Sequence, residues 1–89
     1  MSKVNYIHQR FVVDGVISNR GGITIAFREL DSGEIEYALA RCSQNDNFSK
    51  AMGRVKAEGR LKSNSYRRTS NLSWLEFVKT NAFNLRVPG

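Results

Sequence analysis

The sequence predicts a single α+β domain in which a small antiparallel β-sheet packs against one or two helices. Residues 23–42 alternate as a hairpin, residues 47–58 have a helical pattern after a polar cap, and residues 73–82 begin with a second capping signal. The 89 residues suffice for one domain, 1–89, with a thin core. This length excludes a two-lobed enzyme, a dinucleotide-binding fold and a repeat array.

The first strand-forming segment is residues 4–18, which are rich in β-branched and aromatic side chains. Asp14-Gly15 within it is a strong hairpin signal, although the arms on either side are short. The segment is therefore either one strand with a glycine bulge or a brief hairpin. The following Asn19-Arg20-Gly21-Gly22 is expected to form a turn.

Residues 23–30 and 34–42 are predicted to pair as a hairpin around Gly33, which can supply the positive φ that closes the turn. Pairing of Leu30 with Glu34 fixes the register. This register sets four further pairs across the strands: Phe27 with Tyr37, Ile25 with Leu39, Arg28 with Glu36, and Ala26 with Ala38. One face is then apolar and the other is polar with an ion pair, and a slip of one residue would destroy this separation.

A helix over residues 47–58 is expected to follow the N-cap residue types of 43–47 and to stop at Gly59. Its apolar residues recur at helical spacing and are predicted to face the core: Phe48, Ala51, Met52 and Val55. The opposite face holds a strip of small residues, Gly53 and Ala57. This strip either lets the backbone of a partner approach closely or packs on the C-terminal segment of the same chain.

Residues 62–71 contain no aliphatic side chain and are predicted to form an exposed loop. A second helix is expected near Ser73, because Ser73 and Glu76 have the spacing of a capping box. Its apolar stripe and the residues beside it are Trp74, Val78 and Ala82, with Leu75 and Phe77. Residues 83–87 alternate like a short strand that rejoins the sheet. The stripes of both helices are expected to cover the apolar face of the hairpin.

The charge of the chain is polarised, with a net value of +6. Residues 1–28 carry +3, residues 29–46 carry −4 and residues 47–89 carry +7, which favours polyanionic partners. No apolar run approaches the roughly 20 residues of a membrane span, and the first residues lack the apolar region of a signal peptide. With a single cysteine, these features predict a cytoplasmic protein with no membrane partner.

No catalytic site, metal site, cofactor or small-molecule substrate is predicted, and we expect a protein that is not an enzyme. The one acidic cluster brackets the hairpin turn, where water keeps carboxylates ordinary: Glu29, Asp31, Glu34 and Glu36. His8, the one histidine, lies in a strand-like run and is expected to be structural. Cys42 is expected to be a small buried hydrophobe. No glycine pattern ends in the Gly-Lys-Ser/Thr of a phosphate loop.

The region from residue 50 to residue 68 is predicted to be the binding surface, because it carries seven basic residues against Glu58 alone. Clustered cations neutralise phosphate charges and release counterions, and an aromatic side chain among them can stack on an unpaired base. The predicted binding residues are these seven basic residues, the glycine of the strip and the tyrosine of the loop: Lys50, Gly53, Arg54, Lys56, Arg60, Lys62, Tyr66, Arg67 and Arg68.

The stretch from Cys42 through Gly53-Arg54 to Gly59-Arg60-Leu61 resembles a pattern in small phage-encoded early or accessory proteins. In that pattern a hairpin is followed by a polar cap, an aromatic residue and a Gly-Arg helix that ends in Gly-Arg-Leu. The resemblance spans residues 23–62 and implies a non-catalytic protein that acts inside a bacterial host. It points to Lys50, Gly53, Arg54 and Arg60 as the matching positions.

Two functions follow from the charge and from this resemblance. The first is a small basic binding protein that engages nucleic acid or a nucleoprotein complex through the basic helix and loop. The alternative is an anti-defence, anti-CRISPR-like inhibitor that binds a host defence complex through protein–protein contacts and blocks its function.

Overall fold

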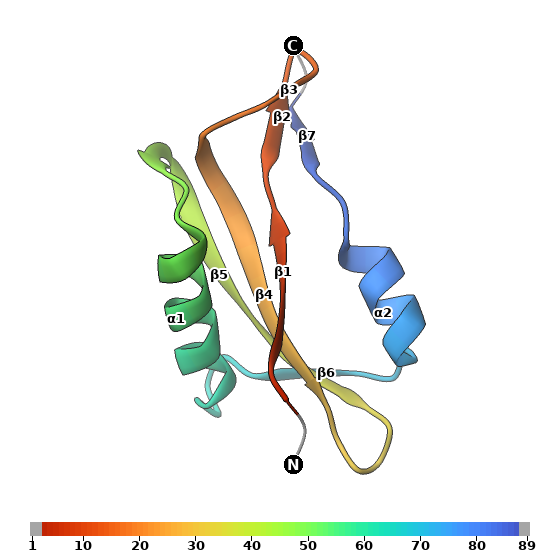
Figure 1. Ribbon diagram of the computed structural model, residues 1–89. Helices are drawn as coiled ribbons and strands as arrows, with labels where there is room; N and C mark the ends of the chain where they lie inside the picture. The colour runs from red at the N-terminus through yellow and green to blue at the C-terminus, as the bar shows by residue number, and fades with distance from the viewer. Residues whose placement is uncertain (1–2, 88–89) are drawn as a thin grey trace.

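The computed structural model describes residues 3–87, over which the chain forms strands and two helices in an α+β fold, as the sequence predicts (Figure 1). In chain order the elements are β1 (Asn5–Gln9), β2 (Phe11–Val13), β3 (Val16–Ile17), β4 (Arg20–Glu29), β5 (Ile35–Asn47), α1 (Lys50–Leu61), β6 (Arg68–Ser70), α2 (Trp74–Asn81) and β7 (Leu85–Val87).

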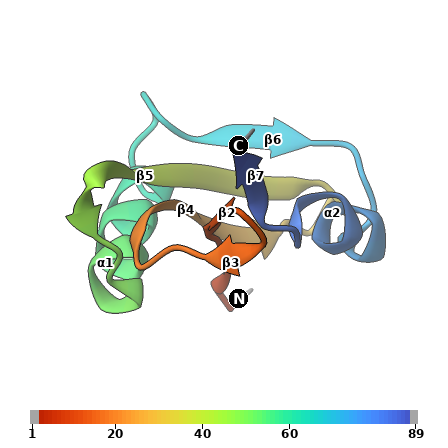
Figure 2. The same ribbon diagram turned by 90° about the horizontal axis from the view of Figure 1, so that it is seen from above.

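The strands form two sheets. The main sheet has the order β1-β4-β5-β6 and is antiparallel throughout, and the smaller sheet has the order β3-β2-β7. A single residue, Arg10, separates β1 from β2, so one extended segment contributes to both sheets. The small sheet lies at one end of the molecule, and α1 and α2 lie on opposite sides of it in both views (Figures 1 and 2).

The central hairpin has the predicted register. The amide of Leu30 donates a hydrogen bond to the carbonyl of Glu34 at 2.8 Å, and Gly33 has a φ of 91°. The predicted cross-strand pairs are all present: Phe27 with Tyr37, Ile25 with Leu39, Arg28 with Glu36, and Ala26 with Ala38. Alternation of side chains along the two strands therefore fixed which residues share a face.

Each face of the hairpin is covered by a different helix, so the expectation that both helices cover one face is wrong. On one face, Phe27 lies against α2, with its ring centroid 4.9 Å from that of Trp74 and 5.1 Å from that of Phe77. The opposite face is lined by small side chains that pack against α1: Ala26, Ala38 and Ala40. Ala57 and Leu61 of α1 are fully buried in this second cluster.

α1 buries the strip of small residues and exposes its long apolar side chains. Met52 is 55% exposed and Val55 is 68% exposed, whereas a Cβ on Gly53 would lie only 3.0 Å from the Cβ of Thr24 in β4. The predictions that Met52, Val55 and Ala51 face the core, and that the strip is exposed or packs on the C-terminal segment, are therefore wrong. A sheet face lined by alanine leaves room only for a close helix backbone, so small residues fill the contact.

The boundaries of α1 also differ from the prediction of residues 47–58. β5 continues through Asn47, so residues 43–47 belong to a strand instead of a cap. Ser49 is the N-cap, and its Oγ accepts a hydrogen bond from the amide of Met52 at 3.2 Å. The helix then passes through Gly59 and ends at Leu61, because Gly59 keeps a helical backbone there and Lys62 provides the C-cap.

The Asp14-Gly15 dipeptide forms the brief hairpin that was one of the two alternatives for residues 4–18. Both residues have positive φ, 51° and 79°, and they connect β2 to β3. The predicted turn at residues 19–22 is wrong, because Arg20 and Gly22 lie within β4 at a shift of its register with β5. A Cβ on Gly22 would lie 2.7 Å from the carbonyl oxygen of Gln9, so the glycine allows close strand packing here.

The C-terminal part follows the prediction with two changes. Ser73 caps α2 as expected, with its Oγ accepting from the amide of Glu76 at 3.3 Å. The segment predicted as a loop contains β6, which pairs with the start of β5 and brings Arg68 opposite Tyr37. Residues 85–87 form a strand, but it lies parallel to β2 in the small sheet instead of rejoining the main one.

Candidate nucleic-acid interface

α1 presents four of the predicted cations to solvent on the side of the main sheet away from α2. These residues are Lys50, Arg54, Lys56 and Arg60. At about 1.5 Å of rise per residue, they extend over roughly 15 Å of the helix axis. Lys50 and Arg54 act electrostatically on His8 in β1, so they lie on the β1 side of the helix. Lys56 lines a hollow beside the last part of β5.

Gly53 does not belong to this exposed surface. The position of its missing Cβ is occupied by the Thr24 side chain, and the closest approach is to Thr24 Oγ1. The prediction that Gly53 contacts a partner is therefore wrong. Its small size lets α1 approach the sheet, and it acts on the exposed cations only by setting the position of their helix.

Arg60, Tyr66 and Arg68 come together at the outer edge of β5. Arg60 Nη1 donates to the carbonyl oxygen of Leu39 at 2.9 Å, and the guanidinium carbon lies 5.5 Å from the centroid of the Tyr66 ring. Tyr66 is 61% exposed. Arg68 lines a shallow hollow of about 130 Å³ with Leu39, Ser65 and Tyr66. An exposed aromatic ring thus has a guanidinium group over it and a second arginine in the same hollow.

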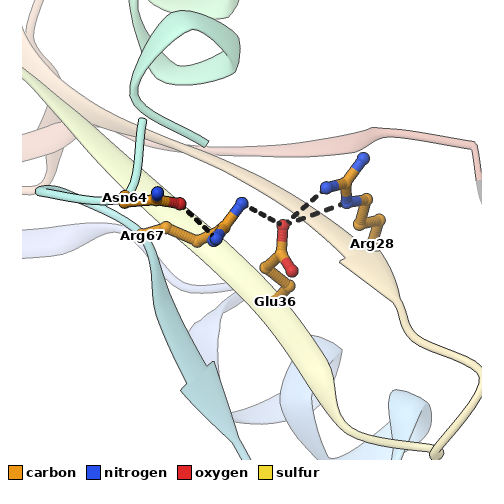
Figure 3. Close-up of polar contacts among 4 residues, drawn as sticks. All are labelled: Arg28, Glu36, Asn64 and Arg67. Carbon is orange, nitrogen blue, oxygen red and sulfur yellow. Dashed lines mark hydrogen bonds and ion pairs between the residues drawn. The ribbon is translucent and has the colours of Figure 1, made fainter. Parts of the chain in front are cut away.

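Arg67 has a different environment, because it binds a buried carboxylate (Figure 3). Its Nη1 lies 3.6 Å from Glu36 Oε1, and the same oxygen is 2.7 Å from Arg28 Nη2. The Glu36 side chain is only 8% exposed. Asn64 accepts a further hydrogen bond from Arg67 Nη2. The fold therefore uses Arg67 to neutralise Glu36, and its placement among freely exposed loop cations is wrong.

Glu58, the one acidic residue of this region, has two partners of its own. Its Oε1 lies 3.3 Å from Lys62 Nζ, and its Oε2 accepts a hydrogen bond from the Tyr6 hydroxyl at 3.2 Å. The hydrogen bonds from Lys62 and from Tyr6 lower the pKa of the Glu58 carboxyl. Because the ion pair is exposed to water, Lys62 remains able to exchange this partner for a phosphate.

Two basic residues near the start of α1 were not among the predicted binding residues. The guanidinium carbon of Arg10 lies 4.7 Å from the centroid of the Phe48 ring, and the His8 and Phe48 rings form a T-shaped pair with centroids 5.8 Å apart. His8 Nδ1 is 2.9 Å from Thr24 Oγ1. Burial lowers the pKa of His8, and the charges of Lys50, Arg54 and Arg10 lower it further.

The hollow beside Lys56 has a volume of about 330 Å³ and is also lined by Cys42, Asp46 and Met52. Cys42 is half-buried instead of fully buried, and its Sγ lies 3.6–3.8 Å from three backbone carbonyl oxygens. Within residues 3–87, no three His, Cys, Asp or Glu residues gather in a way that would hold a metal ion.

Neither helix in the described part of the chain has the length and apolar content needed to cross a membrane. Comparison of the chain with protein-family models, with curated proteins and with solved structures gives no match.

Proposed function

We propose that the protein is a non-enzymatic binding protein that engages single-stranded nucleic acid through α1 and the segment that follows it. The observation that carries this proposal is the cluster of Arg60, Tyr66 and Arg68 at the outer edge of β5. An exposed ring beside two guanidinium groups matches an unpaired base flanked by phosphates, since the ring stacks and the cations bind the backbone.

The cations of α1 extend this surface. Among the side chains that the structure describes, Lys50, Arg54, Lys56 and Arg68 form no ion pair. Uncompensated cations on the exposed surface of a helix bind a polyanion mainly through release of its counterions, with little choice of sequence. Such a surface would also serve an anti-defence protein whose target is a nucleoprotein complex, because that complex presents the same phosphates.

The proposal is tested by fluorescence anisotropy with a labelled oligothymidine and with a duplex, over a series of salt concentrations. For single strands, each phosphate contact contributes a slope of about −0.7 in log affinity against log salt. Lys56→Glu should weaken binding and make the slope shallower. Lys79→Glu is the matched control, because it changes the net charge equally but lies at an exposed position of α2, on the other face of the sheet.

Tyr66 separates stacking from charge. Tyr66→Leu should cost about 1–3 kcal/mol of binding free energy through loss of base stacking. Tyr66→Phe should bind like the wild type, because phenylalanine keeps an aromatic ring that can stack. Equal binding by Lys56→Glu and Lys79→Glu would contradict the proposed surface. A wild-type protein that ignores the oligonucleotide, but forms a salt-resistant complex of fixed stoichiometry with a host protein, would favour the anti-defence alternative instead.

A further inference from the structure

A second group of positive charges lies at the opposite end of α1 from Tyr66. It combines Arg10, from the junction of β1 and β2, with Lys50 and Arg54 of the first turns of α1. Within the described side chains, no ion pair joins any of these three cations to a carboxylate. We refer to Arg10, Lys50 and Arg54 as the β1–α1 cluster.

A continuous chain of contacts holds the β1–α1 cluster around His8. Thr24 Oγ1 is 2.9 Å from His8 Nδ1, and the Thr24 side chain also lies against Gly53. Lys50 and Arg54 are three residues before Gly53 and one residue after it on the same helix. Phe48 supports the other side, because its ring meets both Arg10 and His8.

The orientation of Arg10 is fixed by the fold. Its guanidinium lies over the Phe48 ring, and Nη2 donates to the carbonyl oxygen of Ser18 at 2.9 Å. Nε is buried and has no acceptor within the described residues. A guanidinium that is already held in place is suited to bind an oxyanion through its terminal N–H groups, since little side-chain freedom remains to be lost.

Among the described residues, the charged groups that act most strongly on His8 are cationic. Lys50 and Arg54 act on it from α1 and Arg10 from the end of β1, while Thr24 of β4 contributes only a neutral hydroxyl. Glu58, the nearby acid of α1, binds Tyr6 and Lys62 instead. Burial lowers the pKa of the His8 imidazole, and these like charges lower it further, so an anion placed among the charges would relieve the repulsion between them and protonated His8.

We propose that Arg10, Lys50 and Arg54 form a binding site for one phosphate group and that its occupation places a proton on His8. Under the proposed function, on which this identification of the ligand rests, the phosphate group is a phosphodiester of the bound strand. By thermodynamic reciprocity, an anion that favours protonated His8 must itself bind more tightly when His8 is protonated. We expect the affinity to rise about threefold to tenfold between about pH 8 and pH 5.

The site is tested first without nucleic acid, by following the His8 ring protons by NMR through a pH titration. Sodium sulfate is the probe and sodium chloride at equal ionic strength is the reference, because sulfate keeps its charge where histidine titrates. Sulfate should raise the pKa of His8 above its value in chloride. Lys50→Gln with Arg54→Gln should raise the pKa in chloride and abolish the effect of sulfate.

Lys79→Gln serves as the control for loss of a surface charge, and it should leave both titrations unchanged. Both substituted residues of the test variant are exposed, so a thermal melt should show that it remains folded. An identical pKa of His8 in sulfate and in chloride would overturn the proposal. The proposal would also be overturned if sulfate raised the pKa of His8 in the Lys50→Gln, Arg54→Gln variant as much as in the wild type.

The labelled oligothymidine then identifies the source of the phosphate. Its affinity should rise as pH falls through the titration of His8, and His8→Gln should remove this dependence while binding through Tyr66 persists. An oligonucleotide that binds without moving the His8 titration would overturn the site but leave the proposed function standing. If no oligonucleotide binds, the proposed function fails, while the sulfate titration still decides whether the anion site exists.

Discussion

Replacing Gly53 by alanine should lower the free energy of unfolding by about 0.5–4 kcal/mol, although alanine is the better helix former. The new Cβ would lie 3.0 Å from Thr24 Cβ and closer still to Thr24 Oγ1, where ordinary van der Waals contact begins at 3.4 Å. Thr24 cannot easily move aside, because it is fully buried and hydrogen-bonded to His8.

The magnitude follows from three contributions. Alanine gains about 0.5–1 kcal/mol over glycine in a helix interior. Overpacking of a filled contact costs about 1–3 kcal/mol, and a weakened hydrogen bond between Thr24 and His8 costs a further 0.5–1.5 kcal/mol or so. The costs exceed the gain, so the net change is destabilising.

Gly59 provides the matched control within α1. It lies in the last turn of α1, and a Cβ there would meet nothing within 4 Å, so Gly59→Ala should stabilise the protein by about 0.5–1 kcal/mol. Urea unfolding followed by circular dichroism measures both variants. Thr24→Ala in the Gly53→Ala background should recover part of the loss. If Gly53→Ala were as stable as Gly59→Ala, the close contact between α1 and β4 would be refuted.

Two further predictions concern charges inside the fold. Arg28→Ala should cost about 1–3 kcal/mol of stability, more than an ordinary surface ion pair, because buried Glu36 would keep only the longer contact to Arg67. The loss in urea unfolding should shrink when Glu36→Gln removes the buried charge, and an unchanged loss would contradict this account. Burial and neighbouring cations lower the pKa of His8, so the folded state favours the neutral imidazole over the protonated one. This stabilisation is complete above the pKa of His8 in the unfolded chain, about 6.5, and is lost as pH falls through the lower pKa of the folded state. The urea midpoint of the wild type should therefore fall more steeply below about pH 6.5 than the midpoint of His8→Gln.

The hairpin of β4 and β5 was the most predictable part of the fold. Its turn contains a glycine at the required position, and its two strands carry matched alternating patterns, so local sequence determines both the turn and the register. The capping box at Ser73 was similarly predictable, because Ser73 and Glu76 interact within one turn of helix.

The orientation of α1 was not predictable from its own sequence. A hydrophobic pattern weights Met52 and Val55 above Gly53 and Ala57, but the sheet face beneath the helix is lined by alanine and selects for small size. Which side of α1 faces the sheet therefore depends on residues more than ten positions away in the sequence. Arg67 was misplaced for the same reason, because only the pairing of β6 with β5 brings it to Glu36.

The β1–α1 cluster shows the same limit at the candidate site. Arg10 and His8 precede α1 by some forty residues in the sequence. They reach it only because β1 pairs with β4 and because Phe48 packs between the two segments. The cations of α1 could be found by counting charges, whereas these residues required the fold.

The placement of the two helices on opposite faces has a consequence for the order in which the protein assembles during translation. α1 directly follows β5, so it can dock on the alanine-lined face as soon as it leaves the ribosome. α2 is synthesised after α1 and after the residues 62–73 that separate them, and until it docks the face that carries Ile25, Phe27 and Ile35 is open to water. During this interval the exposed apolar face of the hairpin is of the kind that chaperones bind. One face of the sheet is therefore buried before the other.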